Sequence, residues 1–310
     1  MSTITRRSFA GGLGAAGLLA GLPALAQTGA PFIAGVTSDD GYEAWFAQDA
    51  GFFAKAGLNV QSQLFNNGAT AAAALTGGSL TVACGNVVTV AQARDHGVPI
   101  VLIAPSIVYV NTAANNSLMV LRESPVQSAK DLTGKTVGVL SLQGILSLSL
   151  KVWIDQNGGD SKNVQLVEIT PPQMLAAMQR GTVAAALMVD PFLTAAAPET
   201  RVLGLPSGTF GPRTIVTGWF ATTDWIKQNP AAAKSYAQIM AQTARWANDP
   251  ANRDRATQIV AKYLGRTIDL GKTFYAPTFD SDPMQPILTA AYSYKYISRP
   301  MTVADITAKV

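Results

Sequence analysis

The sequence predicts an α/β protein with two lobes, each a mainly parallel sheet flanked by helices, and three observations lead to this prediction. Short apolar strands alternate with short helical segments over residues 33–104, a rhythm typical of β-α-β units and of a parallel sheet. The polar run 109–117 interrupts the rhythm, which then begins again. The apolar strand 215–221 finally returns the chain to the first lobe. Two crossings between two lobes leave a cleft between them.

The first β-α-β unit places a polar loop at the carboxyl end of its first strand. The polar turn 37–41 follows an apolar strand, and one helix with aromatic residues at helical spacing continues from it to Gly57. The expected cap of this helix is Ser38, Asp39 or Asp40. Ligands of open α/β sheets bind at the carboxyl ends of the strands, so the loop is a candidate site.

The other predicted elements continue this alternation. In the first lobe they are helices 69–75 and 87–95 and strands 58–65, 80–84 and 99–104, with a tight turn at Gly85-Asn86. In the second lobe they are strands 136–140, 164–169 and 183–189, an edge strand 202–205, and helices at 145–155 and 171–181. After the returning strand the expected helices are 224–228, 230–248, 252–264 and 284–297. The first lobe is therefore expected to comprise 27–112 with 218–310, and the second lobe 113–217.

Residues 1–26 have the features of an export signal. The pair Arg6-Arg7 precedes an apolar run over 13–25, and Ala24-Leu25-Ala26 supplies a small-x-small cleavage pattern. The run is short and rich in glycine, which argues against a transmembrane helix. The arginine pair followed by Ser-Phe resembles a twin-arginine signal, and a general secretion signal is the alternative. Both predict a soluble periplasmic protein cleaved near Ala26.

The composition argues against several classes of function. The formal charge of +4 falls to +2 when Arg6 and Arg7 leave with the signal, so neither nucleic acid nor a membrane surface is an expected partner. Cys84 is the only cysteine, so no intrachain disulfide is possible. His96 is the only histidine, so we expect no histidine-rich metal site, and no Ser-His-Asp set is apparent because His96 is the only available base. We expect a buried Cys84, a solvated His96, and a monomer without cofactor, metal or catalytic residues.

Four segments resemble motifs of one protein family, in the same order along the chain. Ala50–Val60 (AGFFAKAGLNV) resembles A-x-G-(F/Y)-F-x-K-x-G-L-x-V, and Ala74–Ala83 resembles A-L-x-x-G-x-x-D-V/A. Asp131–Val139 resembles D-L-K-G-K-x-V-G-V, and Ala177–Ala186 followed by Asp190–Phe192 resembles A-L-x-x-G-x-(V/I)-D-A…E-P. The family is that of the periplasmic substrate-binding proteins of ABC importers, in the nitrate/sulfonate/taurine and thiamine-precursor-like (NMT1-like) group.

The resemblance covers nearly the whole mature chain and implies a function. It implies the type 2 periplasmic-binding-protein fold, in which two lobes joined by two hinge crossovers close on a small molecule and deliver it to a membrane permease. Three positions depart from the family pattern. Thr81 and Ala184 stand where relatives commonly carry Asp, which we expect to alter local hydrogen bonding. Asp190 stands where many carry Glu, and it touches the predicted cleft.

The ligand site is expected in loops that face the cleft at strand carboxyl ends. Loops that begin helices present N–H groups that suit an oxyanion, and Asn, Ser and Gln add uncharged donors. Pro105-Ser106 is a further candidate loop. The predicted ligand-binding residues are Thr37, Ser38, Asp39, Tyr42, Asn66, Asn67, Gly68, Asn86 and Trp219 in the first lobe and Ser141, Gln143, Gly144 and Asp190 in the second.

Structural alternatives stay open at most of these positions. Residues 66–68 are compatible with a plain turn, Ser141 and Gln143 with helix caps, and Tyr42 and Trp219 with core positions. Charge also leaves the ligand class open. Carboxylates at Asp39, Asp40 and Asp190 oppose a bare anion unless they face away, and the nearest cation in sequence is Arg213.

The sequence thus favours a periplasmic solute-binding protein of an ABC importer. Its expected ligand is a small organic anion: a sulfonate, a nitrate-like ion or an aromatic carboxylate. A neutral or amine-bearing heterocycle, such as a thiamine-precursor pyrimidine, is the alternative ligand. A periplasmic enzyme and a ligand sensor on the same scaffold are the alternative classes of function.

Overall fold

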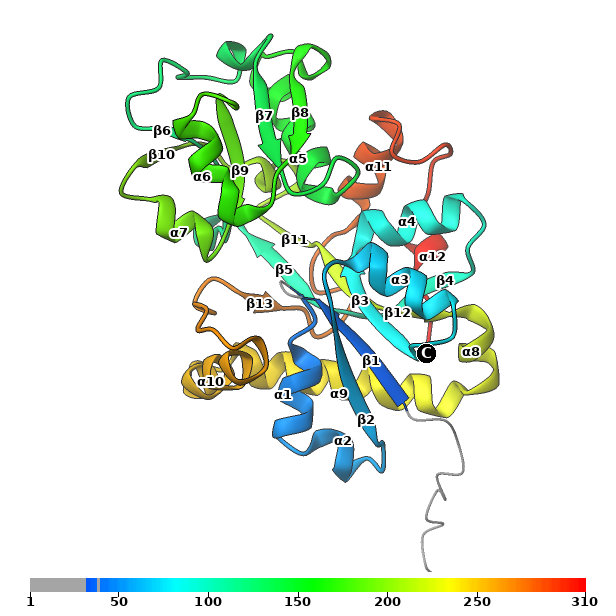
Figure 1. Cartoon of the computed structure of the whole chain (residues 1–310). Helices are drawn as coiled ribbons and strands as arrows, with labels where there is room; N and C mark the ends of the chain where they lie inside the picture. Colours follow the sequence, from blue (N-terminus) through cyan, green and yellow to red (C-terminus); the bar gives the residue numbers. More distant parts are fainter. Residues whose placement is uncertain (1–31, 38–39) are drawn as a thin grey trace, which may run out of the picture. The chain divides into compact units, whose positions relative to one another are not determined.

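The structure is a computed structural model that describes residues 32–37 and 40–310 (Figure 1). The predicted signal 1–26 and the predicted site residues Ser38 and Asp39 lie outside the described residues. The described strands form two five-stranded sheets and one three-stranded sheet. No helix in the described ranges is long and apolar enough to span a bilayer.

The first five-stranded sheet has the order β2-β1-β3-β12-β4. Its strands are β1 (Phe32–Thr37), β2 (Val60–Phe65), β3 (Val82–Asn86), β4 (Ile100–Pro105) and β12 (Thr217–Thr222). β1 runs parallel to β2 and β3, whereas β12 runs antiparallel to β3 and β4. Only β12, the strand that returns the chain to this sheet, therefore opposes the common direction.

The second five-stranded sheet repeats this design in the order β10-β6-β9-β7-β8. Its strands are β6 (Asn116–Leu121), β7 (Thr136–Val139), β8 (Gln165–Glu168), β9 (Ala185–Val189) and β10 (Thr200–Gly204). β7 runs parallel to β8 and β9, and β6, the strand by which the chain enters, runs antiparallel to β9 and β10. Both sheets are thus mainly parallel, as the β-α rhythm predicts.

The two connections between these sheets pair with each other. β5 (Ile107–Val110) lies antiparallel to β11 (Arg213–Ile215), with Val110 opposite Arg213 and Val108 opposite Ile215, and β13 (Phe274–Tyr275) completes the three-stranded sheet. The sequence pattern predicts an irregular segment here and no strand at β5, which is wrong. The physical reason is that β5 is only four residues long and is followed at once by the polar segment 111–115. The exact lobe limits given above stay a prediction.

Twelve α-helices occur in the described residues. They are α1 (Glu43–Asp49), α2 (Phe52–Lys55), α3 (Gly68–Thr76), α4 (Val87–Asp95), α5 (Ile145–Gln156), α6 (Pro171–Gln179), α7 (Phe192–Ala196), α8 (Thr223–Gln228), α9 (Pro230–Asn248), α10 (Arg253–Leu264), α11 (Gln285–Ser293) and α12 (Val303–Ile306). The single helix predicted up to Gly57 is wrong, because Gly51 takes φ +72° and separates α1 from α2. The last predicted helix ends early, at Ser293.

Helices cover the first sheet on both faces. Along β1, Ala34 and Val36 pack into an aromatic-rich cluster with α1 and α9, whereas Ile33 packs into the cluster formed with α3, α4 and α11. This alternation is the period of two of a strand buried on both faces.

Helix α5 has two buried faces that belong to different clusters. Leu150 and Ile154 pack with β6, β7 and β9 of the second sheet. Leu148 and Val152 pack instead into the cluster that contains residues of α4 and α11, and Figure 1 shows α11 beside α5. α5 therefore connects the second sheet to the helices of the first.

Candidate functional site

In the first lobe, two predicted site loops lie directly against each other. A Cβ added to Gly68 would lie 3.1 Å from the Cα of Gly85, and a Cβ on Gly85 would lie 3.3 Å from the Cα of Gly68. The start of α3 therefore contacts the end of β3. This close approach explains why glycine stands at both positions, and it brings Asn66, Asn67 and Gly68 next to Asn86.

Asp40 holds the loop after β1 close to Asn86 through a hydrogen bond to β12. Its buried Oδ1 accepts hydrogen bonds from Thr217 Oγ1 at 2.9 Å and from the backbone N–H of Gly41 at 3.1 Å. Thr217 lies opposite Asn86 in the sheet. The N-cap of α1 is Tyr42, without a side-chain cap, so Asp40 is not the cap; Ser38 and Asp39, the other two residues expected in that role, lie outside the described residues. Thr37, also buried, donates its N–H to the carbonyl oxygen of Asp40 at 2.9 Å and so closes the loop.

Asn67 and Asn86 both cap helices. The Oδ1 of Asn67 accepts from the N–H of Thr70, and the Oδ1 of Asn86 accepts from the N–H of Thr89, each at 2.9 Å. The tight turn predicted at Gly85-Asn86 is wrong, since these residues end β3 and Asn86 leads directly into α4. Because each oxygen is used by its own helix, the amide nitrogens are the parts of these side chains suited to a ligand.

Tyr42 and Trp219 belong to the core of the first lobe in this conformation. Tyr42 stacks on Trp45 with ring centroids 5.4 Å apart, and Trp45 stacks on Tyr263 at 4.7 Å. Trp219 is fully buried and packs edge-to-face on Tyr236. A Cβ on Gly41 would lie 3.3 Å from the Trp219 ring, so the indole forms the floor beneath the Asp40 loop.

In the second lobe, the loop 141–144 is held by its backbone. The N–H of Leu142 donates to Glu168 Oε1 at 2.8 Å, and its carbonyl oxygen accepts from the hydroxyls of Ser147 at 3.0 Å and Tyr296 at 3.1 Å. Gly144 is the N-cap of α5 and no side chain caps that helix, so the alternative that Ser141 or Gln143 acts as a cap is wrong. Both residues are exposed, at the uncapped start of a twelve-residue helix.

Asp190 lies at the end of β9 with both carboxylate oxygens engaged. Oδ1 accepts from the N–H of Thr194 at 3.0 Å and from its hydroxyl at 2.6 Å, and Oδ2 lies 3.4 Å from the ammonium of Lys272. Nearby, the guanidinium of Arg266 lies 5.7 Å from the centre of the Phe192 ring. Lys272 comes from the segment between α10 and β13, so this ion pair joins that segment to the second lobe.

Lys272 is a candidate site residue that the sequence does not predict. Arg213, the nearest cation in sequence, instead forms a bidentate ion pair with Asp282, with distances of 2.7 and 3.2 Å. Lys272 and Asp190 lie 82 residues apart, and no local pattern could have joined them. Lys272 thus offsets the charge of Asp190, which reduces the opposition of that carboxylate to an anion.

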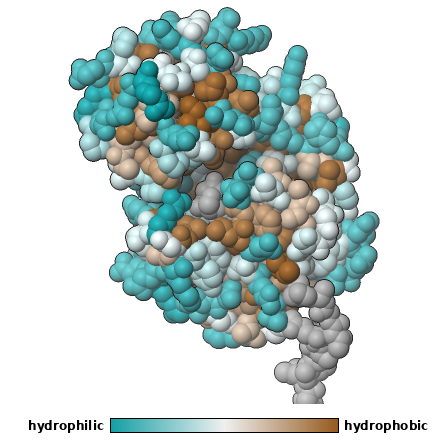
Figure 2. Space-filling model, in the orientation of Figure 1, coloured by the Kyte–Doolittle hydropathy of each residue, from teal (hydrophilic) through white to brown (hydrophobic). Residues whose placement is uncertain are grey.

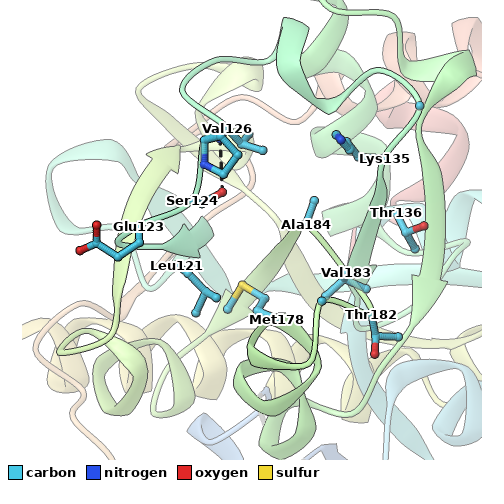
Figure 3. A pocket seen from close by; sticks show the side chains of 13 residues that line it. Leu121, Glu123, Ser124, Val126, Lys135, Thr136, Met178, Thr182, Val183 and Ala184 are labelled. Atoms are coloured by element: carbon cyan, nitrogen blue, oxygen red, sulfur yellow. Dashed lines mark hydrogen bonds between the residues drawn. The ribbon is translucent and has the colours of Figure 1, made fainter.

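A separate hollow of about 540 Å³ lies in the second lobe but away from this site (Figure 3). Thr136 and Ala184 line it at the amino ends of β7 and β9, whereas loop 141–144 and Asp190 follow the carboxyl ends of the same strands. The hollow therefore is not the predicted site. Figure 2 shows apolar surface bordering another depression, between the part that carries α6 and α7 and the part that carries α1 and α10.

Ala184, which lines that hollow, and Thr81 in the first lobe are the two positions where relatives commonly carry Asp. The N–H of Thr81 donates to the carbonyl oxygen of Ile33 at 2.8 Å, and the N–H of Ile33 donates back to Thr81 Oγ1 at 3.0 Å. In the second sheet, the N–H of Ala184 donates to the carbonyl oxygen of Thr136 at 2.8 Å, but the methyl side chain of Ala184 cannot accept a hydrogen bond from the N–H of Thr136. The departure from Asp is therefore compensated at Thr81 and uncompensated at Ala184.

Comparison with known proteins identifies the family. A family model described as NMT1/THI5 like matches residues 43–252, which is more than half of the chain. The chain belongs to the NMT1/THI5-like family. A curated relative of this NMT1/THI5-like protein is the nitrate/nitrite binding protein NrtA of Synechococcus elongatus, 31% identical over 135 residues, which cover 41% of this chain and only 29% of NrtA. The taurine-binding periplasmic protein of Escherichia coli is 25% identical over 247 residues, which cover 74% of each chain.

The solved structures show the same fold. The periplasmic aliphatic sulphonate binding protein SsuA of Escherichia coli superposes with a TM-score of 0.71 and 18% identity, covering 90% of this chain and 92% of SsuA. The predicted two-lobed α/β fold of periplasmic binding proteins is thereby confirmed for this NMT1/THI5-like protein.

Proposed function

We propose that this protein is a periplasmic solute-binding protein of an ABC importer, which captures a small molecule between its two lobes and delivers it to a membrane permease. The observation that carries the proposal is the position of the polar loops. Those at Asp40, Gly68 and Asn86 follow strands of one sheet, those at Gly144 and Asp190 follow strands of the other, and the paired strands β5 and β11 join the two sheets. Two such sets of loops on one hinge suit capture by closure.

The proposed ligand is a small organic anion, such as a sulfonate, a nitrate-like ion or an aromatic carboxylate. Lys272 offers an ammonium at the edge of the second-lobe loops and already offsets the charge of Asp190, and the start of α5 offers uncapped N–H groups. The names of the relatives point the same way, because they bind nitrate or nitrite, taurine and aliphatic sulphonates.

An amine-bearing or neutral heterocycle is the second candidate ligand. The stacked rings of Tyr42, Trp45 and Tyr263 lie in the first lobe together with two buried carboxyl groups, Asp40 and Glu43. Aromatic faces and acids together suit a cationic or hydrogen-bonding ring.

Among the described residues, the lone cysteine is buried and no three His, Cys, Asp or Glu side chains gather into a metal-binding group.

Export completes the proposal. The signal at 1–26, read as twin-arginine, would send the folded chain to the periplasm, where it acts as a soluble monomer. A fusion of residues 1–30 to a reporter, compared with the same fusion carrying Arg6→Lys and Arg7→Lys, tests the route. Loss of export in the double variant alone supports the twin-arginine route, and unchanged export contradicts it.

Calorimetric titration of residues 27–310 against four ligand classes tests the function. The panel contains alkanesulfonates, nitrate, aromatic carboxylates and aminopyrimidines. We expect saturable binding to at least one anion, with a dissociation constant raised in Lys272→Met. Binding of aminopyrimidines alone would favour the second candidate. Turnover of a bound compound, or no heat from any class with folded protein, would contradict the transport function.

A further inference from the structure

Five buried side chains in the core of the first lobe have polar atoms without a protein hydrogen-bond partner. They are both carboxyl oxygens of Glu43, Ser106 Oγ, Trp219 Nε1, Tyr236 OH and Tyr275 OH. All five residues are nearly inaccessible, with exposed fractions of 3% or less. They come from α1, from the end of β4, from β12, from α9 and from β13, so distant parts of the chain converge on one point.

The unpartnered groups face one another. Ser106 and Trp219 are close enough to Glu43 to favour its charged form and so oppose the rise in its pKa that burial causes. Burial is also the main cause that raises the pKa of Tyr236 and Tyr275, and the charge on Glu43 adds to both shifts. The rings of Trp219 and Tyr236 are in contact at 5.5 Å. Two donors, on Ser106 and Trp219, therefore lie near the Glu43 carboxyl, and the two tyrosines are close enough to respond to its charge, yet none of the four forms a hydrogen bond with it.

No cation faces this carboxyl among the described residues. The titratable groups on which the charge of Glu43 acts are Cys84 on β3, Tyr236 on α9 and Tyr275 on β13, and Asp40 acts on two of the same groups, Cys84 and Tyr275. Each is an acid, so none can neutralise a carboxylate. Burial is accordingly the largest influence on Glu43, and it raises the pKa of this group to about 7.

Native proteins rarely leave such groups unpaired, and they commonly satisfy them with ordered internal water. Water can accept from the four donors and donate to the carbonyl oxygen of a neutral Glu43. We propose that the first lobe holds a cluster of internal water molecules around a protonated Glu43, directly beneath the ligand loop, and that loss of this proton destabilises the lobe and weakens capture of an anion. The part about capture rests on the proposed function; the part about the lobe does not.

Glu43 lies close in sequence to the predicted ligand loop that contains Asp40. Glu43 is the first residue of α1, and Asp40, three residues earlier, holds the loop to Thr217. A second negative charge beneath Asp40 would repel an anion bound at that loop. It would also leave a buried charge without a partner, which strongly favours opening of the surrounding core.

The sign of the pH effect follows from the raised pKa. The folded state holds the Glu43 proton more tightly than the unfolded state, so its contribution to stability is complete below pH 4.5 and is lost as the pH rises through about 7. Between these limits the unfolding constant of the wild type should rise about 300-fold relative to a variant that cannot titrate, since one proton gives a factor of ten per pH unit.

Urea unfolding of residues 27–310 from pH 4.5 to 8.5 tests the proposal without any ligand. The wild type is compared with Glu43→Gln and with the exposed control Glu123→Gln. We expect a pH-dependent gap between the wild type and Glu43→Gln, and none for the control. Ser106→Ala removes a hydroxyl that favours the charged form of Glu43. The stability of this variant should therefore fall at a higher pH than the stability of the wild type. Parallel profiles for the wild type and Glu43→Gln would overturn the proposal.

Two further measurements complete the test. Infrared difference spectra of the wild type at pH 6 should contain the carbonyl band of a protonated acid that is missing in Glu43→Gln; this wild-type band serves as the readout if the variant does not fold. With an anion that binds, the dissociation constant should rise at least threefold from pH 6 to 8.5 in the wild type and stay level in Glu43→Gln. A band absent from the wild type would overturn the protonated state, and equal affinity profiles would overturn the link to capture.

Discussion

Replacing Leu148 with alanine tests whether α5 connects the two lobes. Leu148 and Leu150 are both fully buried on the same helix, but Leu148 packs with the helices of the first sheet and Leu150 with the second sheet. Truncation of a fully buried leucine costs about 3 kcal/mol, with a range of roughly 2–5 that depends on how far the cavity collapses. We therefore expect Leu148→Ala and Leu150→Ala to lose similar stability, each lowering the melting temperature by about 6–12 °C.

The assay is equilibrium urea unfolding followed by circular dichroism and by tryptophan fluorescence. Leu150→Ala is the matched control, because its loss depends only on the core of the second sheet. In Leu148→Ala we expect the two probes to diverge, since the lobes lose a shared contact and can unfold separately. A loss below about 1 kcal/mol in Leu148→Ala, with the full loss in the control, would refute the packing of α5 on the first lobe.

Three further substitutions give distinct outcomes. Ala184→Thr should gain about 1 kcal/mol by returning a hydrogen bond to Thr136, whereas Ala184→Val should not; equal unfolding midpoints of the two variants would contradict this. Lys272→Met should change stability by less than about 1 kcal/mol, because the ammonium is part-exposed, but should raise the dissociation constant of an anion about tenfold; an unchanged constant in calorimetry would exclude Lys272 from the site. Tyr296→Phe should lose about 1 kcal/mol in thermal unfolding through its bond to Leu142, and an equal loss in the exposed control Tyr292→Phe would contradict that assignment.

The sequence predicts the main elements well where local signals are strong. Pro230 opens α9 and Asn248 ends it, as expected, because proline suits the first turn of a helix and the following Asp249-Pro250 cannot continue it. Gly77-Gly78 after α3 and Gly181 after α6 likewise mark real helix ends. Local chemistry decides these boundaries, so a single sequence contains the information.

The predictions that are wrong or missing concern features that depend on contacts between residues distant in sequence. Asp40 is one of the three residues predicted as the cap of α1, but its carboxylate accepts a hydrogen bond from the hydroxyl of Thr217, 177 residues away. Lys272 was not foreseen because only the folded chain brings it to Asp190. β5 was missed since a four-residue strand is stabilised by its partner β11 and not by its own pattern.

Pattern also could not separate site residues from core residues in the first lobe. Tyr42 and Trp219 stand next to polar loops, where aromatic residues commonly contact ligands. The structure buries both rings beneath those loops, against Trp45 and Tyr236. The polar end of an aromatic side chain is compatible with either position, so only packing decides.

Small-angle X-ray scattering of residues 27–310, with and without a saturating organic sulfonate, tests the central claim most directly. Closure of two lobes on a solute should reduce the radius of gyration on binding, and in Lys272→Met the same reduction should require about ten times more sulfonate. A titration that saturates with no change in the radius of gyration would contradict capture by closure.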